Sequence, residues 1–139
     1  MDELREKRYN DKINFIVSSM KLIDKDLENE LEKRGVYYSL QTSIESMIDL
    51  IAMIVKDVGI PVKDDENNIL AVAKRYNIEQ TLCDKLKKAN GMRNILVHRY
   101  NTIEEELIFD SIDDLRTLLL KWVNLIEAIL NDLTKNPTD

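Results

Sequence analysis

The sequence predicts an all-α protein, and three observations support this prediction. Apolar residues make up 44% of the 139 residues, enough to form a buried core. Only 3 Gly and 2 Pro interrupt the chain and 33% of its residues are charged, a composition typical of helices joined by short connections. The apolar residues recur at spacings of three and four, the period of amphipathic helices. We therefore expect an antiparallel four-helix bundle with one short extra helix.

The first half of the chain predicts a helical hairpin. One apolar stripe runs through residues 3–33 at helical spacing, and we expect a single long helix there. Gly35 is typical of a helix stop, so the connection to the next helix should be short. The same period resumes at Tyr37 and continues to Val58, which predicts the second helix. The stripe of the first helix consists of Ile13, Ile16, Met20, Ile23, Leu27 and Leu31.

The main loop of the domain is predicted in "DVGIPVKDDENN", because a glycine, a proline and a polar run follow one another there. Asn67 or Asn68 is expected to cap a short helix that ends near Tyr76, where a further break follows. The string "EQTLCDKLKKANGMRNILVHRY" then predicts one helix that continues through Asn90 and Gly91. Its apolar residues keep helical phase, and a glycine inside a helix costs only about 1 kcal/mol.

The last segment predicts a long closing helix. Thr102 and Glu105 form a capping-box pattern immediately before a new apolar stripe. Trp122 falls on this stripe, so we expect it in the core or at an interface. We assign residues 1–133 to a single helical domain and residues 134–139 to a disordered tail. The closing stripe consists of Leu107, Ile108, Ile112, Leu115, Leu118, Leu119, Trp122, Ile126, Ile129 and Leu133.

The composition argues against several classes of protein. Cys83 and His98 are the only cysteine and the only histidine, so neither an intrachain disulfide nor a classical metal site is expected, and no cofactor is implied. The chain offers no signal-peptide core and no membrane span, which predicts a cytoplasmic protein without membrane contact. The net charge of -6 argues against a protein that wraps long nucleic-acid duplexes. Residues 85–100 are nevertheless basic and carry no acid, so this segment can hold a phosphate.

The string "GMRNILVHRY" gathers several polar groups on one helix. Asn94 and His98 are four residues apart and share a face, and Arg93 and Tyr100, seven apart, also align. Arg93 and His98 are separated by roughly 140° around a helix of about 3.6 residues per turn. We therefore expect the four side chains to flank one groove.

Two interpretations fit this groove. In a structural interpretation, Arg93 pairs with an acid on a neighbouring helix, such as Glu45 or Asp49, and His98 caps the helix end. In a functional interpretation, Arg93 holds a phosphate, Asn94 orients the histidine or the substrate, and His98 transfers protons. Metal-independent cleavage of an RNA phosphodiester requires groups of these kinds. Because one histidine cannot easily be acid and base at once, a two-fold dimer would complete such a site.

The string "RNILVHRY" resembles the R-N-x-x-x-H-x-Y signature of the HepT-like toxins of the HEPN superfamily. The strings "SLQTSIESMIDLIAMIVKDVGIP" and "LKKANGMRNILVHRYNTIEEELIF" are similar to other parts of that family, so the resemblance covers about residues 37–129. It implies a HEPN-like helical bundle that forms a two-fold dimer or a larger assembly of dimers. It also implies that RNA is the substrate and that the ribonuclease site lies at the dimer interface.

The resemblance also implies roles for individual residues. Arg93 and His98 match the catalytic pair of the family, and Asn94 matches the polar residue beside the arginine. The implied partner is a minimal nucleotidyltransferase antitoxin of the MntA type, which transfers AMP units to the tyrosine of the motif, here Tyr100. Phosphates added to Tyr100 would bind Arg93, the cation that RNA needs.

Glu45 and Asp49, one turn apart, are expected to support Arg93 or His98 from the facing helix. Two alternatives to a ribonuclease toxin stay open. The chain could be a non-catalytic module that binds a nucleotide or presents a substrate to a nucleotidyltransferase. It could also be a purely structural dimer.

Overall fold

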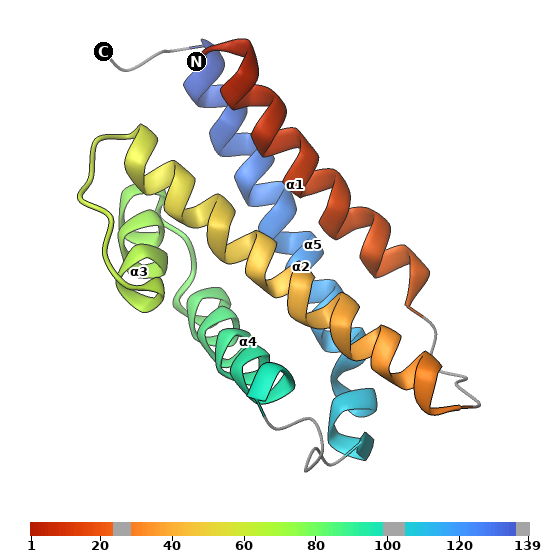
Figure 1. Cartoon of the computed structure of the whole chain (residues 1–139). Coiled ribbons are helices and arrows are strands. Elements are labelled where there is room, and N and C mark those ends of the chain that lie inside the picture. The colour runs from red at the N-terminus through yellow and green to blue at the C-terminus, as the bar shows by residue number, and fades with distance from the viewer. Residues whose placement is uncertain (24–28, 99–104, 136–139) are drawn as a thin grey trace.

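A computed structural model describes residues 1–23, 29–98 and 105–135. These residues form helices and contain no β-strand, so the predicted all-α bundle with one short extra helix is confirmed (Figure 1). The helices are α1 (Glu3–Leu22), α2 (Glu30–Asp57), α3 (Asp65–Tyr76), α4 (Gln80–His98) and α5 (Glu105–Lys135).

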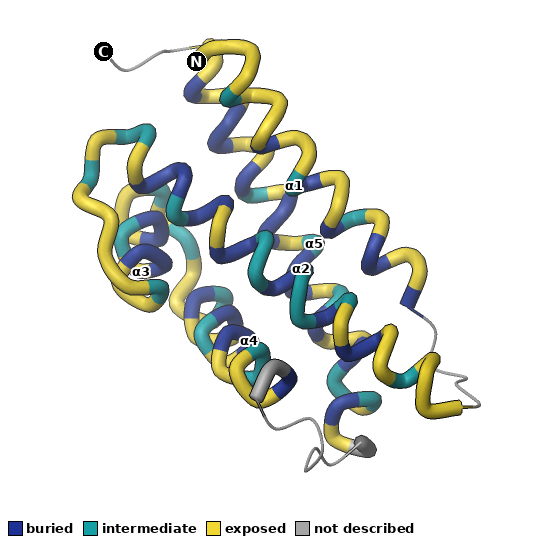
Figure 2. The backbone as a smooth tube through the Cα atoms, in the orientation of Figure 1, coloured by how far each residue is buried: buried dark blue, intermediate teal, exposed yellow. Residues whose placement is uncertain are grey.

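Helix α2 is the central element of the bundle, since it contacts each of the other four helices. The long helices α1, α2 and α5 run along one another, and the shorter α3 and α4 cover another side of α2 (Figure 1). In all five helices, the buried residues lie on the side toward the neighbouring helices and the exposed residues lie on the outside (Figure 2). None of the helices, within the residues described, is long and apolar enough to span a bilayer.

The first helix is shorter than predicted. Helix α1 ends at Leu22, and α2 begins at Glu30 after Asn29, whose side-chain oxygen accepts a hydrogen bond from the Glu32 amide at 2.9 Å. This N-cap satisfies an amide that has no partner within the helix. Gly35 lies inside α2 and stops no helix. The prediction of one helix over residues 3–33 is therefore wrong.

The end of α1 is closed by a side chain from α5. The Arg116 guanidinium donates to the carbonyls of Met20 at 3.0 Å and Ile23 at 2.9 Å. Carbonyls in the last turn of a helix have no partner within it, and a cation there also interacts favourably with the helix dipole. This contact joins α1 to α5.

The other end of α1 is joined to the end of α2 by a polar cluster. The Tyr9 hydroxyl, fully buried, donates to Asp57 Oδ2 at 2.6 Å, and Arg5 Nε donates to the same oxygen at 2.9 Å. Burial, together with the adjacent Asp57 carboxylate, raises the pKa of the Tyr9 hydroxyl. The cluster thus fixes one end of the α1–α2 pair.

The short helix α3 is capped by Asp64. The prediction that Asn67 or Asn68 caps it is wrong. Asp64 Oδ1 accepts from the Asn67 amide at 2.8 Å. Asn68 is buried and ties down the loop before α3, because its amide group makes two hydrogen bonds with the Lys63 backbone. The helix ends at Tyr76, as predicted, and the next residue is left-handed.

Helix α4 continues through Asn90 and Gly91, so the predicted continuity is confirmed. The predicted capping box of Thr102 and Glu105 lies outside the described residues and side chains. Helix α5 continues to Lys135, two residues past the predicted boundary of the tail, and residues 136–139 lie outside the description.

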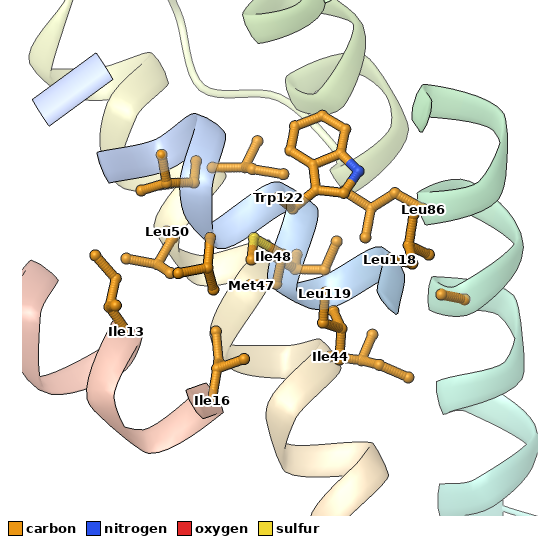
Figure 3. Packing of buried hydrophobic residues seen from close by; sticks show 14 of the residues in the cluster. Ile13, Ile16, Ile44, Met47, Ile48, Leu50, Leu86, Leu118, Leu119 and Trp122 are labelled. Atoms are coloured by element: carbon orange, nitrogen blue, oxygen red, sulfur yellow. The ribbon is translucent and has the colours of Figure 1, made fainter. Parts of the chain in front are cut away.

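The core is formed by apolar residues from all five helices. Figure 3 shows labelled residues of α1, α2, α4 and α5 that take part in it. Trp122 was expected in the core or at an interface, and it is fully buried in the core. Its Nε1 donates a hydrogen bond to the Leu82 carbonyl of α4 at 3.2 Å. Every member of the predicted closing stripe is buried except Leu107, which is exposed. Tyr37 is buried and Tyr38 is exposed.

Candidate active site on helix α4

Two of the predicted site residues lie side by side near the end of α4. Arg93 is half-buried, and Asn94 is exposed. Arg93 Nη2 donates to Asn94 Oδ1 at 3.2 Å. The two side chains therefore form one polar unit whose arginine is restrained by its neighbour.

The carboxylate of Asp65, in the first turn of α3, supports this unit. Arg93 Nη2 lies 3.7 Å from Asp65 Oδ2, and 22% of the arginine side chain and 41% of the aspartate side chain are exposed. The same Asp65 oxygen accepts from Asn90 Nδ2 at 3.1 Å. Because Arg93 and Asn90 are three residues apart on α4, one carboxylate from α3 contacts both. The start of α3 is thereby joined to the polar end of α4.

Asn90 is a buried polar residue on the apolar face of α4. Its residue exposure is only 8%, and its side-chain amide nitrogen is bound to Asp65. Its Oδ1 has no hydrogen-bond partner within the described part of the chain. An unsatisfied buried acceptor costs about 1–3 kcal/mol, so a water molecule or a ligand donor would be favoured beside this oxygen.

Arg93 does pair with an acid of a neighbouring helix, but that acid is Asp65 and not Glu45 or Asp49. Asp49 pairs with Lys12 of α1 at 3.3 Å, and Glu45 accepts from Gln41 of its own helix at 3.2 Å. Glu45 also lines a surface hollow with residues of α1. Both acids thus lie on the side of α2 that faces α1, and Asp65 takes the place that was predicted for them at Arg93.

The remaining predicted site residues are only partly described. Helix α4 ends at His98, so the backbone places His98 one turn after Asn94 on the same face. The His98 side chain and all of Tyr100 lie outside the description. The support of His98 by Glu45 or Asp49 therefore stays a prediction.

Sequence reasoning missed Asp65. This residue belongs to the run "DDENN", in which every acid is suited to the start of a helix, and Asp64 is the one that caps α3. No local pattern marks the second acid as the partner of a residue 28 positions later. Only the packing of α3 against α4 brings the two together.

Metal and thiol chemistry receive no specific support from the described residues. No group of three or more His, Cys, Asp or Glu side chains in that part of the chain is arranged to hold a metal ion. Cys83 is buried, and burial raises the pKa of its thiol. A protonated, inaccessible thiol is a poor nucleophile.

The polar unit on α4 falls within a stretch that matches a known protein family. The sequence model of the family described as "Ribonuclease HepT-like" matches residues 7–126. The chain belongs to the HepT-like ribonuclease family. The family resemblance inferred from "RNILVHRY" is thereby confirmed.

Two proteins of Archaeoglobus fulgidus, each named as a candidate RNase, are similar to the chain along its length. One is 41% identical over 130 residues, which cover 94% of this chain and 98% of the relative. The other is 30% identical over 130 residues, covering 91% of this chain and 98% of the relative.

A solved structure of a tri-AMPylated Shewanella oneidensis HEPN toxin in complex with an MNT antitoxin has a similar fold. It aligns with a TM-score of 0.76 at 24% identity, covering 92% of this chain and 99% of that one. At this identity the similarity establishes the HEPN-like fold, in agreement with the fold class predicted from the sequence.

Proposed function

We propose that the protein is a metal-independent endoribonuclease toxin whose active site lies at the interface of a two-fold dimer. The observation that carries this proposal is the restrained Arg93–Asn94 unit on the helix that ends at His98. Membership of the HepT-like ribonuclease family supports it. Arg93 and His98 are the proposed catalytic residues, and Asn94 orients the histidine or the substrate.

The proposed reaction is transesterification within RNA. A neutral His98 removes the proton of a 2′-hydroxyl, and the resulting oxygen attacks the adjacent phosphorus. The His98 of the second protomer, in its protonated form, gives a proton to the departing 5′-oxygen, so that a 2′,3′-cyclic phosphate and a 5′-hydroxyl result. A histidine with a pKa of about 6.5 is present in both forms near neutral pH.

Arg93 would stabilise the negative charge that develops on the phosphate. Its contacts with described residues use only Nη2, and a guanidinium has five N–H donors. The pair with Asp65 is partly exposed, and such pairs contribute at most about 1 kcal/mol. A phosphate can therefore compete with Asp65 for Arg93 at little cost.

The proposed regulator is a minimal nucleotidyltransferase of the MntA type. It would transfer AMP from ATP to the Tyr100 hydroxyl, releasing pyrophosphate. The similar fold of a tri-AMPylated HEPN toxin bound to an MNT antitoxin supports this proposal. Tyr100 follows His98 by two residues, so the added phosphates would lie near enough to bind Arg93 in place of RNA.

Cleavage of RNA in the presence of EDTA tests the catalytic proposal. The wild-type protein should cut, and Arg93→Ala and His98→Ala should not, whereas Lys74→Ala, a change at an exposed residue of α3, should cut normally. Equal cleavage by the wild type and both site variants would refute the assignment. Absence of cleavage, together with AMP binding that depends on Arg93, would instead favour a non-catalytic nucleotide-binding module.

Intact mass after co-expression with the nucleotidyltransferase tests the regulatory proposal. The toxin should gain mass in units of AMP, and Tyr100→Phe should gain none. Tyr38→Phe is the matched control, because Tyr38 is an exposed tyrosine on α2. A mass gain that persists in Tyr100→Phe and disappears in Tyr38→Phe would contradict the assignment.

A further inference from the structure

A groove between α4 and α5 is a second feature with the character of a binding site. It has a volume of about 360 Å³, which lies in the range of small-molecule pockets. Its lining comes from these two helices, with a floor of leucine, alanine and methionine side chains and a rim of lysines. The groove therefore offers an apolar surface and a positive edge at the same place.

The charge of this groove is opposite to that of the whole protein. Lys85, Lys88 and Lys121 line it, against a single acid, Asp114. None of the three lysines forms an ion pair with any residue in the described ranges, although the chain carries a net charge of -6. Three unpaired ammonium groups around one hollow favour an anionic ligand.

The floor restricts the ligand further. Met92 of α4 and Leu118 of α5 both contribute apolar side chains to this floor. The sulfur of a methionine makes favourable contacts with aromatic rings. Thr117 adds an exposed hydroxyl at the α5 wall. An inorganic anion would leave the floor uncovered, and an uncharged ring would leave the lysines unused. A nucleotide has both the planar base and the phosphate that the groove can accommodate.

The lining of the groove includes neither Arg93 nor Asn94. Met92 and Asn94 are two positions apart, which is about 200° around a helix axis. A ligand against Met92 is therefore turned away from the face of Asn94 and His98. A second copy of the chain is a less suitable occupant, because a two-fold contact through this groove would bring its lysines near those of the other copy.

We propose that the groove between α4 and α5 binds a nucleotide unit, with its base on the apolar floor and its phosphate at Lys85, Lys88 and Lys121. The site is distinct from Arg93 and His98 and goes beyond the proposed cleavage reaction. The nucleotide is either free in solution or part of an RNA strand, because both present the same base and phosphate.

Calorimetry with the full-length protein tests the proposal, with AMP as the probe. AMP should bind saturably and more tightly than adenosine or inorganic phosphate. The triple variant Lys85→Gln, Lys88→Gln and Lys121→Gln should weaken binding roughly tenfold, because it removes the positive charges that attract the phosphate. Thr117→Glu, which adds a negative charge at an exposed position, should weaken it as well. Thermal unfolding will show that each variant is folded.

Two control variants locate the binding. Lys74→Gln removes an exposed lysine from α3 and should bind AMP as the wild type does. Arg93→Ala should also retain AMP binding, and this variant allows a short oligoadenylate to be titrated without cleavage. Tighter binding of the oligoadenylate than of AMP would identify RNA as the source, and the reverse order would identify the free nucleotide.

The proposal is overturned if the wild type shows no saturable AMP binding, or if the triple lysine variant binds as tightly as the wild type. It is also overturned if Arg93→Ala abolishes AMP binding, because the ligand would then occupy the cleavage site. Measuring RNA cleavage by the triple variant separates the two proposals. Loss of AMP binding with intact cleavage supports the groove and leaves the proposed ribonuclease unaffected.

Discussion

Replacing Asp65 by Asn tests whether the contact from α3 holds Arg93 in place. The Arg93 and Asp65 charges approach to 3.7 Å, a distance at which Coulomb attraction ranges from about 1 kcal/mol in water to about 4.5 kcal/mol at an effective dielectric constant of about 20. Because 41% of the Asp65 side chain is exposed, the lower end applies, and we expect a contribution of at most about 1 kcal/mol.

Asp65→Asn is chosen because it removes the negative charge of the side chain and keeps a hydrogen-bond acceptor. An asparagine can still accept the hydrogen bond from Asn90, so that donor stays satisfied. Asp65→Ala would remove this acceptor too, and should cost about 1–3 kcal/mol more. Glu66→Gln is the matched control, because it removes the same charge from the same exposed turn of α3. Any effect of the helix dipole is then common to Asp65→Asn and Glu66→Gln.

Urea denaturation of the single and double variants of Asp65 and Arg93 measures the pair directly. The double-mutant cycle should give a coupling of about 0.2–1 kcal/mol. If the pair positions Arg93 for RNA, turnover by Asp65→Asn should fall by up to about fivefold, which corresponds to about 1 kcal/mol, while Glu66→Gln cleaves normally. Zero coupling, with Asp65→Asn and Glu66→Gln indistinguishable in both assays, would refute this role for Asp65.

Further predictions concern stability and can be checked by urea denaturation or by hydrogen exchange. Tyr9→Phe should lower the free energy of unfolding by about 1–3 kcal/mol, because it removes a buried hydrogen bond to the Asp57 carboxylate. The raised pKa of Tyr9 means that the unfolded chain ionises at about pH 10 while the folded one stays protonated, so stability is full below that pH and falls as pH rises above it. Tyr9→Phe should flatten this alkaline decline, and an unchanged slope would contradict the assignment. Trp122→Phe should cost about 2 kcal/mol, through a cavity and the lost hydrogen bond to Leu82. Arg116→Ala should speed hydrogen exchange in the last turn of α1 far more than in α3.

The helices were predictable where the spacing of apolar residues agrees with the local capping residues. The closing stripe on α5 and the continuity of α4 through Asn90 and Gly91 both follow from helical phase. The boundary between α1 and α2 was not predicted, because residues 27 and 31 continue the spacing of the first stripe. The cap at Asn29 ends that continuity, and Leu31 is 80% exposed.

The candidate site was predictable only within its own helix. Arg93 and Asn94 are neighbours in sequence, and their joint placement on α4 follows from the helix alone. The acid that contacts Arg93 comes from another helix, and two acids on α2 had equally suitable charge and spacing. Choosing between them and Asp65 requires the relative positions of α2, α3 and α4, which no pattern in the chain specifies.

The burial of Trp122 provides the protein with an internal optical reporter. It is the only tryptophan of the chain, it is fully buried, and its indole nitrogen is bound to a carbonyl of α4. Unfolding or separation of α4 from α5 would expose the indole to water and shift its fluorescence emission to longer wavelength. Leu82, whose carbonyl accepts the hydrogen bond from this indole, also lines the groove between these helices. Emission from one native residue can therefore follow unfolding and the separation of α4 from α5, without any attached label.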